Sequence, residues 1–564
     1  MLVRSLKLWL MVLLAQLVAL LTFVRAEDAE QPPPLPKGIE VLARGPVHEA
    51  FASLAGEPEP TKPVAKQPPK PLDELPPTEK PEGNVVWIGG YWAWDDERKD
   101  FLWVSGVWRT PPPGKQWIAG YWREEGEQWQ WVGGFWTQTA AEQETKEVAY
   151  LPQPPQPPTV APPGQPPVAD AFFVPGVWMW NAERGSYAWR AGYWARVQQG
   201  YVWVPDHYRW TPAGFLFIPG YWDLAVSRRG VMYAPIVVDP LVVTAGFSYT
   251  PAYAVSDTVV VDALFVRPSY GFYYFGDYYG PAYTTLGFQS VYVYGGRRYD
   301  SIVVYETWAH RSQPNWVSIQ VDIFNGRSRG TLPVPPRTLV QQNTIVQNNI
   351  TNVTNVTNVT NNITKNTTNV ARTANYNTTV LAPTSKIAAA KGMKTVPLDT
   401  ATRAQAKQQA ATVQQVAAQR TATEKPLPPG SPRQARVASL SVPKAQPVQS
   451  GFVAPKVSPQ AAANVRTAAP PRPATTPSPG LSPAAHAAPA HPGAPTPAAH
   501  FSPQGQQAGH PAATPLGGAR PGSNPAARPG QPPRGTPGVA PRPAPRPPTP
   551  PSRRPPPKDK KENH

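Results

Sequence analysis

The chain has 564 residues, of which 78 are proline and none is cysteine, and its formal net charge is +17 at pH 7. The lack of cysteine excludes disulfides, thiolate zinc sites and cysteine nucleophiles. Because the prolines gather in residues 31–82, 152–168 and the region beyond about 425, where a packed core is not expected, we place the folded part at roughly 85–330.

The N-terminus has the pattern of an export signal. Two basic residues precede an apolar run from Leu8 to Val24, and Ala26 ends a small-residue cleavage motif. We expect residues 1–26 to be a signal peptide cleaved after Ala26, and the length of the run leaves an uncleaved anchor as the alternative. Residues 27–84 are predicted to be a Pro-rich disordered linker. With the absence of cysteine, these features predict an exported bacterial protein of the periplasm, the cell surface or the extracellular space.

Seventeen of the 20 tryptophans lie between residues 87 and 222 and follow a W-x-x-G-x-W pattern. The pattern gives eight units, at 87–92, 103–108, 117–122, 131–136, 173–178, 189–194, 203–208 and 217–222. Start-to-start spacings are 16, 14 and 14 in each set of four, and the second set lies 86 residues after the first. This regularity indicates a duplicated module. Module 1 spans 85–138, module 2 spans 172–224, and a Pro-rich linker at 139–171 joins them.

Each repeat unit has the length of a strand followed by a tight turn. We expect strands at 85–94, 101–109, 116–123, 128–137, 172–181, 187–196, 200–210 and 215–224. The four strands of each module would form an antiparallel meander. The glycine at position 4 would leave open backbone over which an indole from a neighbouring strand can lie. Positions 2, 4 and 6 are predicted to face the core, and positions 1, 3 and 5 the other side.

The pattern resembles the bacterial W-x-x-G-x-W repeat family, also written Y-x-W-G-x-W, over residues 85–224. Members of that family look like exported envelope proteins with no established biochemical activity, so the resemblance implies location and repeat identity and supplies no catalytic residues. A weaker likeness to choline- or glucan-binding cell-wall repeats offers a functional analogy, because aromatic rings hold the ligand there.

The aromatic residues at the odd positions form the candidate ligand surface of the sequence. They are Trp87, Tyr91, Trp103, Trp117, Tyr121, Trp131, Trp189, Tyr193 and Tyr221. If these rings were exposed and coplanar, the repeats would form a carbohydrate- or cell-wall-binding module. If they were buried, they would only build the sheets.

The remaining chain divides into four segments. Residues 225–330 read as a Tyr/Gly-rich β segment, with strands near 300–308 and 316–323 and an aromatic stretch expected to serve packing or a loop rather than a ligand. Residues 331–382 are an Asn/Thr-rich low-complexity or stalk segment, and 383–424 an Ala/Gln-rich helical segment with its helix at 399–421. Residues 425–564 are predicted to be a disordered, basic Pro/Ala-rich tail.

The predicted fold is mainly β, with two duplicated four-stranded antiparallel meanders, a further β-rich segment, a short helix and long disordered regions. Phosphate-binding, zinc-protease and calcium-loop motifs are absent from the sequence, and its eight histidines are scattered, so we expect no enzyme and no cofactor. The leading hypothesis is an exported envelope protein of structural or interaction type. Expected partners are envelope polysaccharide, peptidoglycan or another envelope protein, with polyanions for the basic tail, no specific nucleic acid and no spanning helix beyond the signal segment.

Overall fold

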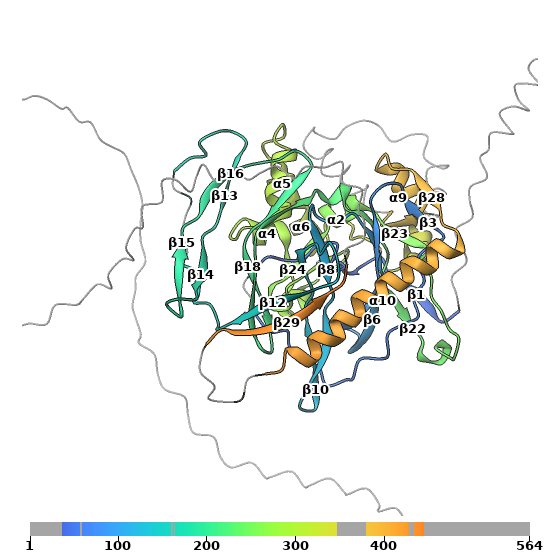
Figure 1. Ribbon diagram of the computed structural model, residues 1–564. Helices are drawn as coiled ribbons and strands as arrows, with labels where there is room; N and C mark the ends of the chain where they lie inside the picture. Colours follow the sequence, from blue (N-terminus) through green and yellow to red (C-terminus); the bar gives the residue numbers. More distant parts are fainter. Residues whose placement is uncertain are drawn as a thin grey trace, which may run out of the picture. The chain divides into compact units, whose positions relative to one another are not determined.

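The computed structural model describes residues 37–56, 59–158, 162, 164–346, 379–426, 428 and 434–444 (Figure 1). These all belong to the first of two units, residues 1–470, into which the chain divides. The predicted signal peptide, most of the Asn/Thr-rich segment and most of the tail lie outside the described residues. The described part is mainly β and its strands pair antiparallel, which confirms the predicted fold class. None of its helices is long and apolar enough to cross a membrane.

The repeat units pair two by two into four antiparallel hairpins, which we number 1 to 4. Hairpin 1 consists of β4 (Val86–Ile88), β5 (Tyr91–Asp95), β6 (Asp100–Val104) and β7 (Val107–Arg109). Hairpin 2 consists of β8 (Lys115–Ile118), β9 (Tyr121–Glu125), β10 (Gln128–Val132) and β11 (Phe135–Gln138). Hairpin 3 consists of β13 (Ala171–Val174), β14 (Val177–Asn181), β15 (Ser186–Arg190) and β16 (Tyr193–Arg196). Hairpin 4 consists of β17 (Tyr201–Val204), β18 (His207–Thr211), β19 (Gly214–Ile218) and β20 (Tyr221–Leu224).

The cross-strand register joins the first aromatic of one unit to the sixth residue of its partner unit. In hairpin 1, Trp87 pairs with Trp108 and Trp92 with Trp103. Both pairs meet edge to face, with ring centroids 5.2 Å apart. The equivalent pairs in hairpin 3 lie 86 residues later and are Phe173 with Trp194 and Trp178 with Trp189. The duplication has therefore kept the register as well as the spacing.

Each unit is interrupted where one continuous strand was predicted. We call the two interruptions of a hairpin its break; these are residues 89–90 with 105–106, 119–120 with 133–134, 175–176 with 191–192, and 205–206 with 219–220. The prediction of continuous strands is wrong here because backbone groups leave the ladder. In hairpin 1 the Gly90 N–H donates to the Glu74 side chain instead of to the paired strand.

The pairing between hairpins also differs from the predicted four-stranded meanders. In hairpin 1, β7 pairs on its outer side with β21 (Gly230–Met232), and β6 pairs with β22 (Ile236–Val238). The edges that would have accepted the third repeat unit are thus occupied by strands from the segment after the repeats.

The segment 37–84 was predicted to be disordered, and this is wrong. It contains β1 (Ile39–Val41), β2 (Gly45–Pro46) and β3 (Glu79–Pro81). Apolar side chains between its prolines supply the reason, since Val47, Ala50 and Phe51 are fully buried in the main hydrophobic cluster.

The linker at 139–171 and the start of the tail also contain ordered strands, contrary to the prediction. β12 (Glu144–Leu151) pairs with β29 (Arg436–Val442) along its length and with β19 at its end. Tyr150 and Leu440, whose side chains are buried, anchor the two strands in the core.

The segment 225–330 mixes strands with helices. Its strands include β23 (Tyr253–Val255), β24 (Leu264–Arg267), β25 (Phe272–Phe275) and β26 (Gln289–Ser290). Its helices are α2 (Asp257–Asp262), α3 (Pro281–Thr285), α4 (Val291–Gly295), α5 (Ser301–Ala309) and α6 (Trp316–Ser328), with short 3-10 turns η1 (Val226–Arg228), η2 (Pro240–Val242) and η3 (Pro268–Tyr270). The strands predicted at 300–308 and 316–323 are therefore wrong. Asp300 caps α5 by accepting from the N–H groups of Ile302 and Val303, so local capping and burial outweigh the β propensity of this run.

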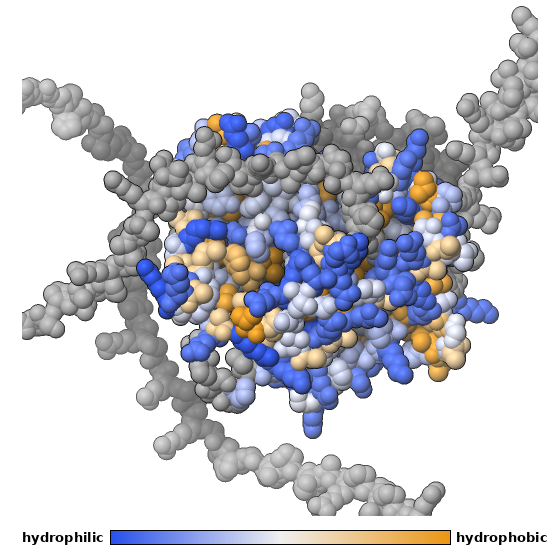
Figure 2. Space-filling view, viewed as in Figure 1, coloured by the Kyte–Doolittle hydropathy of each residue, from blue (hydrophilic) through white to orange (hydrophobic). Residues whose placement is uncertain are grey.

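The last described segment returns to the repeats. It holds β27 (Leu381–Pro383), α9 (Thr384–Ala390), β28 (Thr395–Pro397) and α10 (Thr400–Thr423). Helix α10 agrees with the helix predicted at 399–421 and is capped by Asp399, whose side chain accepts from the Thr402 N–H at 2.7 Å. Figure 1 shows α10 in orange, and Figure 2 shows mostly hydrophilic residues where it crosses this face. Its inner side contacts hairpins 1 and 2.

Candidate functional site

The predicted aromatic ligand surface is largely buried. The buried rings are those of Trp87, Trp103, Trp117, Tyr121, Trp131 and Tyr221. These six rings therefore build the sheets and form no exposed ligand surface, because other parts of the chain, including residues 37–84 and α10, cover them. Tyr91 is only partly buried, yet it stacks on Trp131 at 4.9 Å. Trp189 and Tyr193 remain, both partly exposed and both in hairpin 3.

A buried glutamate fills the break of hairpin 1. The Glu74 carboxylate accepts from the backbone N–H groups of Gly90 at 2.7 Å and Gly106 at 2.9 Å. It also accepts from the indole N–H of Trp103 at 3.2 Å. His48 satisfies a carbonyl oxygen of the same break. Its Nδ1 accepts from the Ala50 N–H, so the ring carries its proton on Nε2, which donates to the Gly89 carbonyl oxygen at 3.1 Å.

A second buried glutamate fills the break of hairpin 2. The Glu49 carboxylate accepts from the Gly134 N–H and from the Trp131 indole, both at 3.1 Å. Arg420, which is fully buried on α10, donates to the carbonyl oxygens of Ala119 at 2.7 Å and Gly133 at 3.1 Å. The donors and acceptors released by the break are thus taken up by one anion and one cation from distant segments.

Hairpin 4 carries its own carboxylate. Asp206 stands at the position of the motif glycine and accepts from the Gly220 N–H at 2.9 Å. Asp206 therefore does in hairpin 4 what Glu74 and Glu49, from the segment before the repeats, do in hairpins 1 and 2. Asp206 also forms an ion pair with Arg190 of hairpin 3.

Hairpin 3 has the same break without a carboxylate. Within the described residues, no hydrogen bond is made by the N–H of Gly176, the N–H of Gly192 or the indole N–H of Trp189. The break is also more open than that of hairpin 1, since Gly176 and Gly192 are partly exposed, whereas their equivalents Gly90 and Gly106 are buried.

Burial controls the pKa values at these sites. Burial raises the pKa of Glu74 from 4.5 to about 7, although the three N–H donors favour the ionised form. Burial raises the pKa of Glu49 in the same way, opposed by Arg209, Trp131, Gly134 and Arg420. Burial lowers the pKa of His48 to about 4, which keeps the ring neutral near pH 7.

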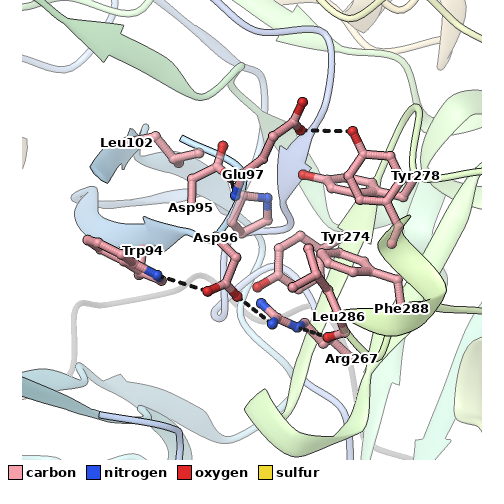
Figure 3. Close-up of a pocket in the computed structure, with 12 residues that line it drawn as sticks. Trp94, Asp95, Asp96, Glu97, Leu102, Arg267, Tyr274, Tyr278, Leu286 and Phe288 are labelled. Atoms are coloured by element: carbon pink, nitrogen blue, oxygen red, sulfur yellow. Dashed lines mark hydrogen bonds and ion pairs between the residues drawn. The ribbon is translucent and has the colours of Figure 1, made fainter. Parts of the chain in front are cut away.

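A separate pocket lies at the acidic turn after β5 (Figure 3). Asp96 accepts from the Trp94 indole at 3.0 Å and forms an ion pair with Arg267. Glu97 forms an ion pair with Arg44 and accepts from the Tyr283 hydroxyl at 2.8 Å. The turn is therefore held against Arg44 and Arg267 by its charges.

Aromatic rings line another part of this pocket. Tyr278 stacks on Phe288 with ring centroids 4.4 Å apart, and Tyr274 packs against both rings. All three are buried, which agrees with the expected packing role of the aromatic stretch. Although burial opposes it, hydrogen bonds from Arg44, Tyr283 and Arg337 lower the pKa of Glu97 to about 2. The pocket joins the repeats to residues 267–288.

Sequence reasoning missed Glu49 and Glu74, because both lie in the segment predicted to be disordered. Their signal is an acidic residue followed directly by an apolar one in a segment that contains proline, as in "PVHEAF" and "PLDELPP". Among the residues that the structure describes, no three His, Asp or Glu side chains gather where they could hold a metal ion.

Comparison with known proteins identifies the repeats. The family described as the WXXGXW repeat (2 copies) matches residues 84–109, 173–195 and 200–223. No curated protein and no solved structure matches the chain. Units 3 and 4, between the matched ranges, have the same pairing geometry as the others. The resemblance drawn from the tryptophan spacing is thus confirmed, and residues 84–223 carry repeats of the WXXGXW family.

Proposed function

We propose that this protein is an exported, non-catalytic protein of the bacterial envelope that binds another envelope protein through hairpin 3. The observation that carries the proposal is the partial exposure of four aromatic residues there. Phe173, Trp178, Trp189 and Trp194 form its two cross-strand pairs, and none is buried.

The comparison with the other hairpins sharpens this observation. The four aromatics of hairpin 3 belong to none of the hydrophobic clusters of the described residues, whereas their equivalents in hairpins 1, 2 and 4 all do. Hairpin 3 packs on hairpin 4 through other side chains, which include Phe172, Val174 and Tyr187. Large exposed aromatics are enriched where proteins bind one another, because they bury much area at little cost in side-chain entropy.

The ring geometry favours a protein over a sugar as the partner. A flat sugar platform needs rings that are coplanar, and the two pairs of hairpin 3 cross at 69° and 66°. Edges and faces of the aromatic rings therefore alternate along the hairpin. Such a surface suits the side chains of a protein partner, which can fit between the rings.

Two further parts of the proposal rest on other features. Export is supported by the repeat family and by the signal-like start of the chain. A non-catalytic role is supported by the use of the Glu74 and Asp206 carboxylates, which hold backbone N–H groups of the repeats.

Site-specific photo-crosslinking in cells tests this function. A photoreactive amino acid would replace Ala188 or Arg196, which are exposed in hairpin 3, or Gln138, which is exposed in hairpin 2 and serves as the control. We expect one discrete protein adduct from the first two positions and none from Gln138, in a fraction that excludes the cytoplasm. No adduct, equal adducts from the control, or a cytoplasmic location would contradict the proposal.

A further inference from the structure

The open break of hairpin 3 presents three hydrogen-bond donors in a geometry that the same chain uses elsewhere. Gly176, Gly192 and Trp189 lie 86 residues after Gly90, Gly106 and Trp103. The pairing of Trp178 with Trp189 repeats that of Trp92 with Trp103. In hairpin 1 the three donors converge on one carboxylate, that of Glu74.

We infer that the break of hairpin 3 is a binding site for a carboxylate side chain supplied by the partner polypeptide. This inference rests on the proposed function and names what the partner brings. Two backbone N–H groups and one indole N–H would donate charge-assisted hydrogen bonds to this carboxylate, as their equivalents do to Glu74.

No carboxylate of the described residues accepts from these three donors, and Asp206, which pairs with Arg190 of this hairpin, accepts instead from the Gly220 N–H of hairpin 4. Hairpin 1 receives Glu74 from the Pro-rich segment that precedes it, but the Pro-rich segment before hairpin 3 has no acidic residue between Glu147 and Asp170. Asp170 itself lies 3.9 Å from Arg196 at the end of the hairpin, away from the break. Arg190, which follows Trp189 directly and has a side chain two-fifths exposed, already forms an ion pair with Asp206, so a carboxylate from outside would depend mainly on the three N–H donors of the break.

The surroundings indicate an extended acidic segment as the occupant. Glu74 reaches its site from a run with proline on both sides, and this run forms a bridge with Tyr249 instead of a helix. The exposed Pro175 and Ala191 leave room for such a run over hairpin 3, and the partly exposed rings of Trp178 and Trp194 would cover its apolar side chains.

The probe for a binding experiment is a peptide with the sequence of residues 70–78, KPLDELPPT, and a second peptide in which only the glutamate equivalent to Glu74 is glutamine. Calorimetry with the full chain would compare the protein as it is with Trp189→Phe and Trp180→Phe. Trp180 lies in the same hairpin and its indole N–H is buried without a hydrogen bond, so its substitution is the matched control. Unfolding curves would verify that both variants fold.

We expect the glutamate peptide to bind at least about tenfold more tightly than the glutamine peptide, and Trp189→Phe to weaken it several-fold. Trp180→Phe should change the affinity less than twofold. Equal affinities for the two peptides, equal effects of the two variants, or no binding of either peptide would overturn the carboxylate site. A photo-adduct on hairpin 3 together with equal peptide affinities would leave the proposed function standing and remove this inference alone.

The acidic residues Glu27, Asp28 and Glu30 of the chain itself are the competing source. The peptide titration would be repeated with these residues changed to Gln, Asn and Gln. Unchanged affinity supports a partner's carboxylate. Binding that appears only in this variant would assign the site to the chain's own N-terminal segment and overturn the proposal.

Discussion

The indole of Trp103 lies against the backbone of Gly90, so closely that a Cβ built on this glycine would come within 2.6 Å of Trp103 Nε1. It would also come within 2.3 Å of the Val104 carbonyl oxygen. The same contact between the first aromatic of one unit and the glycine of its partner unit recurs at Gly106, Gly120, Gly134, Gly176, Gly192 and Gly220. The glycine of the motif therefore leaves the space in which the first aromatic ring of the partner unit packs.

This contact predicts opposite outcomes for two neighbouring glycines. Gly90→Ala should lower the free energy of unfolding by at least about 2 kcal/mol, because neither the paired backbone nor the packed indole can move aside. Gly89→Ala should change it by less than about 0.5 kcal/mol, since a Cβ there meets only Ala410 Cβ, at 3.6 Å. Chemical denaturation of the two variants would check this. Similar losses of unfolding free energy in both would show that the packing of the ring on Gly90 is not what the motif requires.

Glu74→Gln should change the pH dependence of stability. The folded-state pKa of Glu74 is raised from 4.5 to about 7, so the folded protein holds more protons than the unfolded chain between these values. The contribution of Glu74 is then complete below about pH 4.5 and is lost as the pH rises through 7. Relative to the variant, the original protein should lose roughly 3 kcal/mol over this window. Urea unfolding at several pH values measures the difference, with the exposed Glu127→Gln as control. A difference that is constant or grows with pH would contradict the assignment.

Asp223→Asn should be strongly destabilising. Asp223 is buried and bonds Arg109 at 2.5 Å and Arg229 at 3.1 Å, both also buried. The change leaves two buried guanidinium groups short of their counter-charge, at a cost of about 3–5 kcal/mol. Asp170→Asn removes an exposed pair and should cost less than about 1 kcal/mol. Thermal and urea unfolding compare the two, and comparable losses would refute the importance of burial.

Amide hydrogen exchange should distinguish the break of hairpin 3 from those of hairpins 1 and 2. The N–H groups of Gly90, Gly106 and Gly134 are held by buried carboxylates and should exchange slowly. Those of Gly176 and Gly192 should exchange much faster, and an excess of the glutamate peptide should slow them. Slow exchange at Gly176 and Gly192 in the free protein would mean that the break of hairpin 3 is already occupied.

The sequence predicts the repeats well because their determinants are local. Spacing locates the eight units and their 86-residue duplication, turn residues locate the hairpin turns, and the glycine beneath an indole is found as expected. The break is not predictable from one unit, because it depends on a side chain that comes from elsewhere. Glu49, for instance, lies 85 residues before Gly134, and its carboxylate accepts a hydrogen bond from the Gly134 N–H.

The errors outside the repeats have the same origin. Proline content correctly marks residues 37–84 as poor in regular structure, but Phe51 and Val47 are buried by strands and helices hundreds of residues away in sequence. The β-branched run at 301–304 becomes helix α5 because Asp300 caps it, a competition between two local signals that composition alone does not decide.

The pairing of β12 with β29 has a consequence for the order of events in biosynthesis. Glu144 pairs with Val442. Strand β12, which is synthesised between the two repeat modules, therefore cannot pair with β29 until both modules have been synthesised. A chain that emerges from its N-terminus leaves that edge of β12 unpaired until residue 442 has appeared, and loop closure over such a separation is slow. The body of the protein is therefore completed late, by a strand that stands just before the long basic tail.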